Sequence, residues 1–198
     1  MEAGIFVGLD LSFSSTGFYM IQEGKKNISF EIDTKPDNFS GDLERADCIA
    51  KCIIDRLAGL PVTLVALEDY FCGKQPGSVI KLAILGTMVR TRILESGLSF
   101  MAFAPTQIKK FETGSGVAPK DTMLKSVFKK HGFDTNSNNM ADACAIAFIG
   151  KAYYEWCNGR REYLKYEEEV LKKVSKERTI TCPYQLNSNS SEKIKIRG

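Results

Sequence analysis

A short apolar run that ends in a single aspartate limits the folds open to this chain. The run is Ile5–Asp10, and a Ser/Gly-rich turn leads from it into a second apolar run, Gly17–Ile21. Runs of this length and composition are typical of strands, so the pair predicts a β-hairpin. A carboxylate in a core strand is costly unless a metal ion, a hydrogen-bond network or a basic partner compensates its charge. The structural alternative is that Asp10 caps the turn.

The rest of the chain continues with strand and helix patterns. Alternation over 27–33 predicts a third strand, and a continuous apolar run predicts a buried strand at 62–67. Apolar spacing predicts helices at 43–60, 78–96, 105–111, 120–131 and 139–157, with another short strand at 99–104. This order predicts an α/β fold, a mixed five-stranded sheet with helices on both faces.

The length of 198 residues predicts one domain, 1–158, with a C-terminal extension, 159–198. The extension is basic. It is expected to begin as an exposed helix, in which Glu167–Glu169 face Lys172 and Lys173, and to end in a disordered polar segment. No signal peptide or membrane-spanning run is seen. A single histidine and cysteines without CxxC spacing disfavour a zinc site.

Charge is distributed unevenly along the chain. Acidic residues predominate over 31–69, whereas basic residues predominate over 73–130. A basic sector beside clustered carboxylates suits a polyanionic substrate that is handled by metal ions. The alternative is that both sectors are ordinary solvated faces.

Further acidic residues recur where they can join Asp10. Alternation along the fourth strand points Glu68 and Asp69 to opposite faces, so only one of them can share a face with Asp10. Asn139 and Asp142 lie one turn apart on the last core helix and share a face. Oxygen ligands of this kind bind Mg²⁺ or Mn²⁺, and two such ions can catalyse phosphodiester hydrolysis.

Four motifs then occur in an order that resembles a known family. They are Gly8–Asp10 with Thr16 and Gly17, Leu67 and Glu68 followed by Phe71 and Lys74, the glycine loop Gly114–Lys120, and Met140–Ala147. Over about 5–149 the chain resembles a RuvC-type Holliday-junction resolvase of the RNase H-like superfamily. A compact core with a basic tail would suit a viral or phage version.

The resemblance implies a metal-dependent endonuclease that resolves four-way or other branched DNA by paired nicking. Asp10, Glu68 and Asp142 would hold two Mg²⁺ or Mn²⁺ ions, and Lys120 would stabilise the scissile phosphate. The protein would act as a homodimer through the helix at 78–96, in the cytoplasm or at the nucleoid, with no membrane partner and no small-molecule cofactor. The implied DNA contacts are Phe71, Lys74, Lys81, Lys109, Lys110 and Lys120.

One position departs from the family pattern. Asn139 stands where the family usually has a fourth acidic residue or a histidine. An amide oxygen can ligate a hard cation, but it brings no charge. We therefore expect Asn139 to be a fourth, neutral ligand of the catalytic site, and Asn138 or Asp134 is the alternative if the motif aligns in another register. Two other functions stay open, an actin-like or sugar-kinase-like ATPase fragment and a branched-DNA-binding protein that has lost cleavage.

Overall fold

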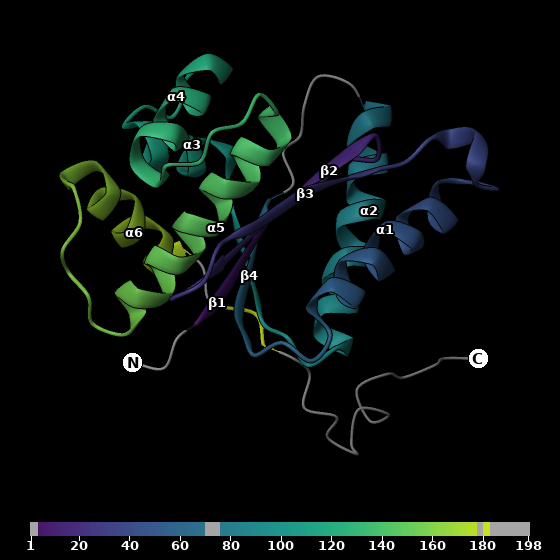
Figure 1. The fold of residues 1–198 in the computed structure, drawn as a ribbon, viewed down its shortest axis with the longest axis horizontal. Helices are drawn as coiled ribbons and strands as arrows, with labels where there is room; N and C mark the ends of the chain where they lie inside the picture. The colour runs from purple at the N-terminus through teal and green to yellow at the C-terminus, as the bar shows by residue number, and fades with distance from the viewer. Residues whose placement is uncertain (1–3, 70–75, 178–179, 183–198) are drawn as a thin grey trace, which may run out of the picture.

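Five strands form one mixed sheet in the order β3-β2-β1-β4-β5 (Figure 1). The structure is a computed structural model and describes residues 4–69, 76–177 and 180–182. The strands are β1 (Ile5–Asp10), β2 (Ser15–Gln22), β3 (Ile28–Asp33), β4 (Val62–Glu68) and β5 (Phe100–Phe103). The first three are antiparallel neighbours, whereas β4 runs parallel to both β1 and β5. The predicted mixed five-stranded sheet is confirmed.

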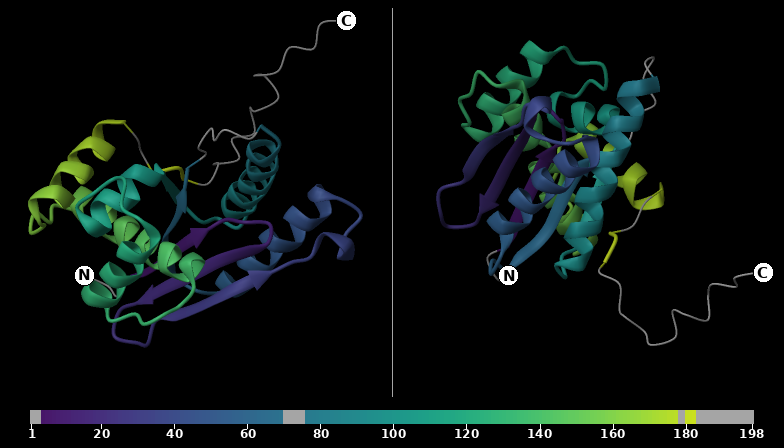
Figure 2. Two further views of the ribbon diagram at one scale, coloured as in Figure 1. Left: turned by 90° about the horizontal axis from the view of Figure 1, so that it is seen from above. Right: turned by 90° about the vertical axis from the view of Figure 1, so that its right-hand side faces the viewer.

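Helices cover both faces of this sheet, as Figures 1 and 2 show. One layer holds α1 (Asp42–Leu57) and α2 (Pro76–Glu95), and a short 3₁₀ helix, η1 (Pro36–Asn38), precedes α1. The other layer holds α3 (Pro105–Thr113), α4 (Lys120–His131), α5 (Asn138–Cys157) and α6 (Lys165–Glu177). Within the described part of the chain, no helix has both the length and the apolar character needed to cross a bilayer.

Two cores lie on either side of the sheet because strand residues alternate between its faces. Val7 and Leu9 of β1 are buried against α1 and α2, in a cluster that includes Ile53 and Val89. Phe6 belongs to the opposite cluster, which α5 dominates. The same alternation places Gly8 and Asp10 on the α5 side of β1.

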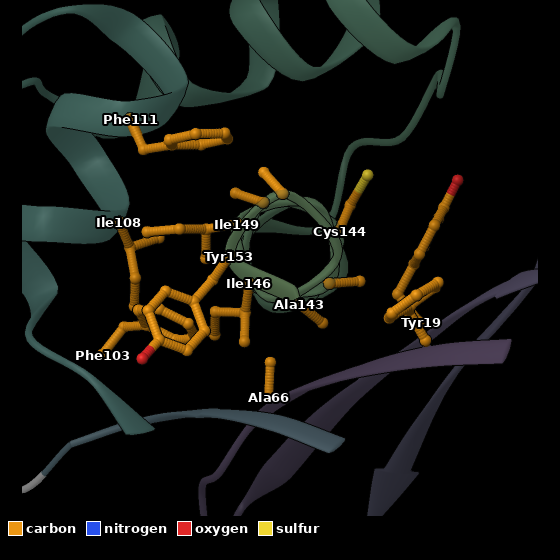
Figure 3. Packing of buried hydrophobic residues seen from close by; sticks show 14 of the residues in the cluster. Tyr19, Ala66, Phe103, Ile108, Phe111, Ala143, Cys144, Ile146, Ile149 and Tyr153 are labelled. Carbon is orange, nitrogen blue, oxygen red and sulfur yellow. The ribbon is translucent and has the colours of Figure 1, made fainter. Parts of the chain in front are cut away.

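Glycines allow α5 to lie unusually close to the sheet. A Cβ on Gly8 would lie 2.1 Å from the carbonyl oxygen of Ala143, and one on Gly17 would lie 2.2 Å from that of Asn139. Further along the helix, a Cβ on Gly150 would lie 2.6 Å from the Cβ of Ala66. Figure 3 looks along α5 and shows Ala66 pointing from the sheet toward the helix. Any side chain at these glycines would push α5 away from the strands that carry Asp10.

The prediction that the C-terminal extension starts as an exposed helix is wrong in one respect. The predicted charge pairing is present, since Lys172 Nζ lies 2.8 Å from Glu168 Oε1. However, Val170, Leu171 and Val174 lie on one face of α6 and are buried in the α5-side core. The apolar residues between the charges, spaced one and four apart, give the helix a buried face that its charge pattern does not reveal.

The chain returns to the sheet after α6. Phe100 at the start of β5 and Thr181 exchange two backbone hydrogen bonds, each with an N···O distance of 2.9 Å. Thr181 thereby pairs with an end of the edge strand β5. The predicted disordered segment beyond it, 183–198, lies outside the described residues.

Candidate active site

One row of positions across the sheet carries three carboxylates. Asp10 at the end of β1 pairs in register with Gly17 of β2, which in turn pairs with Glu31 of β3. On the other side, Leu9 pairs with Leu67 of β4, so Glu68 follows beside Asp10. Residues side by side on neighbouring strands point to the same face, which here is the α5 face. Asp142 of α5, the helix that packs on this face, lies close enough to Asp10 and Glu68 to interact with both.

The turn after Asp10 is closed by a buried threonine. Thr16 Oγ1 donates to the carbonyl oxygen of Ser12 at 2.7 Å, and the Ser12 amide donates to Thr16 Oγ1 at 3.1 Å. Thr16 is completely buried. The turn therefore holds its shape through Thr16. Among the residues that the structure describes, no hydrogen bond of Asp10 supports the alternative in which Asp10 caps the turn.

Electrostatic coupling shows that the three predicted carboxylates lie together. Burial, followed by repulsion from Asp142 and Glu68, raises the pKa of Asp10 to about 8, against an opposing effect of Lys120. Burial and then repulsion from Asp142 raise the pKa of Glu68 to about 7. Burial also raises the pKa of Asp142. Carboxylates that are desolvated and repel one another favour the binding of a cation, because its positive charge offsets both effects.

Two of the predicted lysines face this acidic group. Lys109 of α3 lowers the pKa of Glu68 and Asp142, and Lys120, the first residue of α4, lowers the pKa of Asp10 and Asp142. The glycine loop before Lys120 thus brings the N-terminus of α4 to the carboxylates. The structure places one lysine beside each of the two strand acids.

The other predicted DNA contacts are distributed differently. Lys110 Nζ lies 2.9 Å from Glu169 of α6. Lys81 of α2 is 3.3 Å from Asp42 of α1, on the opposite helical layer from α5. Phe71 and Lys74 lie outside the described residues.

Glu68 and Asp69 point to opposite faces, as alternation predicts. Asp69 Oδ1 lies 3.3 Å from Nη2 of Arg90 on α2, which shows that this carboxylate belongs to the α2 side. A cavity of about 30 Å³ reaches the strand ends here and is lined by Asp10, Leu11, Glu68, Asp69, Leu82 and Gly86. Its volume is that of about one water molecule, so it is a small gap at the strand ends and not a pocket for a ligand.

Glu31 is a site residue that the sequence analysis missed. Its carboxylate raises the pKa of Asp10, and it accepts a hydrogen bond of 2.9 Å from the Nδ2 atom of Asn139. The alternation over 27–33 was visible in the sequence and placed Glu31 on a face of its strand. The sequence did not show the register in which this strand pairs with its neighbour, and that register decides which residues lie beside Glu31.

The donor atoms of the site suit a hard divalent cation. They are carboxylate and amide oxygens, the ligands that Mg²⁺ and Mn²⁺ prefer. Among the residues that the structure describes, no three His, Cys, Asp or Glu side chains are gathered tightly enough to hold one ion as they stand. The raised pKa values of Asp10 and Glu68 nevertheless fit a cation, because a bound positive charge would offset both burial and mutual repulsion.

A larger cavity, of about 370 Å³, lies away from these carboxylates. It is formed by α3, α4, α5, α6 and the segment between α5 and α6, and its lining includes Lys130 and Arg160. Lys130 Nζ lies 2.7 Å from Glu167, and Arg160 Nη1 lies 2.6 Å from Glu155. The charges of this cavity are thus balanced by neighbouring glutamates, and the predicted site residues do not line it.

Solved structures with the same fold come from Thermus thermophilus. The RuvC structure of that organism superimposes with a TM-score of 0.66 at 24% identity, covering 77% of this chain and 96% of the other. T. thermophilus RuvC in complex with a Holliday junction substrate gives the same TM-score at 21% identity. These likenesses confirm the predicted RNase H-like fold.

Sequence comparisons agree with the structural ones. RuvC of Helicobacter pylori (strain ATCC 700392 / 26695) is 36% identical over 98 residues, which are 48% of this chain and 60% of the relative. RuvC of Synechococcus sp. (strain CC9311) is 32% identical over 156 residues, covering 73% of this chain and 96% of the relative. The family model for crossover junction endodeoxyribonuclease RuvC matches residues 6–150, and the chain therefore belongs to the RuvC family.

Proposed function

We propose that this protein is a metal-dependent endonuclease that cuts branched DNA at four-way junctions. The observation that carries the proposal is the convergence of Asp10, Glu68 and Asp142, from two strands and a helix, opposite Lys109 and Lys120. Acids alone would suit many metal sites. Carboxylates that lie opposite positively charged lysines suit a substrate that brings negative charge to the metal, as a phosphodiester does.

The carboxylates would hold Mg²⁺ or Mn²⁺, two ions per site, with Asn139 as a neutral fourth ligand. When bound, such ions activate water and stabilise the leaving oxygen of a phosphodiester. Asp10, Glu68 and Asp142 supply the negative charge that retains the ions. Because these three groups are partly buried on regular elements, β1, β4 and α5, they are held in place before the substrate arrives, and little reorganisation is needed.

The lysines would act on the DNA phosphates. Lys120 lies beside Asp10 and Asp142, where it can neutralise charge that develops on the scissile phosphate. Lys109 lies beside Glu68 and Asp142 and can bind the same or a neighbouring phosphate. Lys110 and Lys81 form ion pairs with exposed or partly exposed acids. A DNA phosphate can replace the acid in such a pair at low cost in free energy.

Paired nicking would require two copies of the chain. We place the second copy against α2, whose inner face packs on α1 through Leu85 and Val89 and whose outer face exposes Ile80. Ile80 is 62% exposed. A twofold contact of this helix with itself would give two active sites related by symmetry, one for each cut strand.

The extension at 159–198 would have two roles. Its α6 would complete the core described above, whereas the basic residues after Cys182 would add affinity for DNA. Removal of 183–198 alone should weaken junction binding and reduce its salt dependence, because fewer counterions would be released. An unchanged salt slope would show that this segment does not contact DNA.

The deciding experiment incubates the full chain with a synthetic four-way junction, labelled on each strand in turn, and with the matched duplex. We expect symmetrical nicks in the junction that require Mg²⁺ or Mn²⁺ and are stopped by EDTA. A gel shift without cleavage would instead support the non-cleaving junction-binding protein. ATP hydrolysis without cleavage would support the actin-like or sugar-kinase-like ATPase, and either result would overturn the proposal.

A further inference from the structure

The Glu31 carboxylate is held by three side chains at the edge of the acidic site. Its Oε1 atom accepts hydrogen bonds from Asn139 Nδ2 at 2.9 Å, from Ser137 Oγ at 2.9 Å and from Ser15 Oγ at 3.0 Å. The three donors come from two elements that are far apart in the sequence. Ser15 is on β2, whereas Ser137 and Asn139 are at the start of α5. Glu31 therefore has little freedom to move.

The backbone of Asn139 lies over the sheet between Glu31 and Asp10. Its backbone carbonyl oxygen packs over Gly17, where a Cβ would come within 2.2 Å of it. Gly17 separates Glu31 from Asp10 in the row of paired positions across the sheet. From this place the Nδ2 atom of Asn139 reaches Glu31, and Asp142 follows one helical turn along the same face of α5.

The two ends of an asparagine amide are not equivalent toward a carboxylate. An ionised carboxylate accepts hydrogen bonds and donates none, so it attracts Nδ2 and repels Oδ1. If the amide of Asn139 were turned over, two acceptor oxygens would face each other at hydrogen-bond distance. With Nδ2 committed to Glu31, the atom that Asn139 can offer on its other side is Oδ1, which is the atom that a hard cation binds.

We propose that Glu31 is a positioning residue that fixes the Asn139 amide so that Oδ1 faces the metal. The inference rests on the proposed function, because it requires a divalent cation between Asp10, Glu68 and Asp142. A neutral amide can replace a charged ligand here because a carboxylate on a neighbouring strand selects its orientation.

The test measures Mn²⁺ binding directly, from the free-ion electron paramagnetic resonance signal, with no DNA present. We expect Glu31→Ala to raise the Mn²⁺ dissociation constant about 10–100-fold, the usual cost of losing the partner of a metal ligand. Asn139→Ala should have the same effect, and the double variant should agree with either single variant to within about twofold. A double variant as weak as the product of both single effects would overturn the proposal.

The Asn139→Asp background gives a second, distinct prediction. A carboxylate at 139 presents oxygen in both orientations, so it needs no orienting partner. In that background the rise in the Mn²⁺ dissociation constant caused by Glu31→Ala should shrink to about twofold or less. If Glu31 acted only by adding negative charge near the metal, its removal would weaken binding by the same factor in both backgrounds, and that result would also overturn the proposal.

Two controls separate orientation from charge and from folding. Asp33→Ala removes one negative charge from the same face of β3, two residues along at an exposed position, and should leave Mn²⁺ binding unchanged. An effect of Asp33→Ala equal to that of Glu31→Ala would refute a specific role of Glu31. Thermal unfolding in EDTA, compared among all variants, identifies any that lose metal because they lose structure, and the Asn139→Asp pair keeps the test available if Glu31→Ala alone is unstable.

Failure of this inference can be told from failure of the proposed function. Suppose that the effects of Glu31→Ala and Asn139→Ala on Mn²⁺ binding are coupled as expected, but the wild-type chain does not cut a four-way junction. The positioning role then stands and the nuclease proposal fails. If it cuts junctions but Glu31→Ala binds Mn²⁺ normally, the reverse holds. A wild-type chain that binds no Mn²⁺ overturns the positioning role.

Discussion

At the scale of single residues, Asp10 should be indispensable for cleavage but not for DNA binding. Asp10→Asn keeps the size of the side chain and removes one ligand charge, while Lys109 and Lys120 remain. We expect cleavage to fall by more than about a hundredfold, since loss of a ligand's partner alone already costs about 10–100-fold in activity or metal affinity. Junction binding in Ca²⁺ should persist. Asp55→Asn, at an exposed position of α1, is the control, and cleavage by Asp10→Asn at the control rate would exclude Asp10 from the site.

Lys120 should affect the reaction rate more than DNA affinity. If its charge stabilises the transition state, Lys120→Ala should lower the single-turnover rate by about 10²–10³-fold, the range for removing one preorganised donor. The dissociation constant for the junction should change little. Lys125→Ala removes an exposed lysine from the same helix and serves as the control. Equal losses of rate and affinity would make Lys120 a simple backbone contact.

The buried acids should also make stability depend on pH when metal is absent. The pKa values of Asp10, about 8, and Glu68, about 7, lie above the ordinary values near 4. From about pH 4 to about pH 8 the native state then holds protons that the unfolded chain releases, so the free energy of unfolding falls as pH rises through this window. Thermal unfolding in EDTA should show this fall.

Bound metal and removal of the charge should both weaken that dependence. Saturating Mg²⁺ replaces the protons and should stabilise the protein most at the alkaline end of the range. Asp10→Asn should flatten the slope in EDTA, because one of the titrating groups is gone. A slope in EDTA that is the same for the wild type and Asp10→Asn would contradict the assignment of Asp10 as a buried, proton-holding group.

At the scale of elements, the site depends on how closely α5 lies on the sheet. Gly17→Ala would place a methyl group 2.2 Å from the carbonyl oxygen of Asn139, which is backbone and cannot rotate away. We expect destabilisation of about 1–3 kcal/mol or more from this overpacking, together with weaker Mn²⁺ binding because Asn139 and Asp142 move with the helix. Denaturant unfolding and Mn²⁺ binding measure the two effects.

Gly41→Ala provides the matched control. Gly41 precedes α1, has an extended backbone, and a Cβ there would meet open space. Its substitution should leave both stability and Mn²⁺ binding close to those of the wild type. Normal Mn²⁺ binding by Gly17→Ala would mean that the close approach of α5 is unnecessary for the site.

At the scale of the whole molecule, α6 should be part of the folded unit, although the family model ends at residue 150. Leu171 is completely buried. Leu171→Ala should therefore cost about 2–5 kcal/mol of unfolding free energy, the range for truncating a buried leucine. Leu164→Ala, at a position 53% exposed just before the helix, should cost much less. Equal, small effects of both substitutions on chemical denaturation would show that α6 is dispensable.

Local patterns in the sequence were enough to predict the sheet, most helix boundaries and the three carboxylates that the fold brings together. Strand alternation separated Glu68 from Asp69, and helical spacing put Asn139 and Asp142 on one face. Both periodicities are properties of the backbone, so they can be read without knowing what packs against what. The order of four motifs along the chain then indicated the family.

Tertiary structure decided which residues complete the site and which face each helix buries. Glu31 joins the site only because β3 pairs with β2 in one register and α5 presses on Gly17, and both relationships link residues far apart in the chain. Lys110 turns to Glu169 because α6 packs against α3. Register and packing depend on long-range contacts whose energy no local stretch contains, so the sequence determined the chemical groups of this protein and the fold decided their partners.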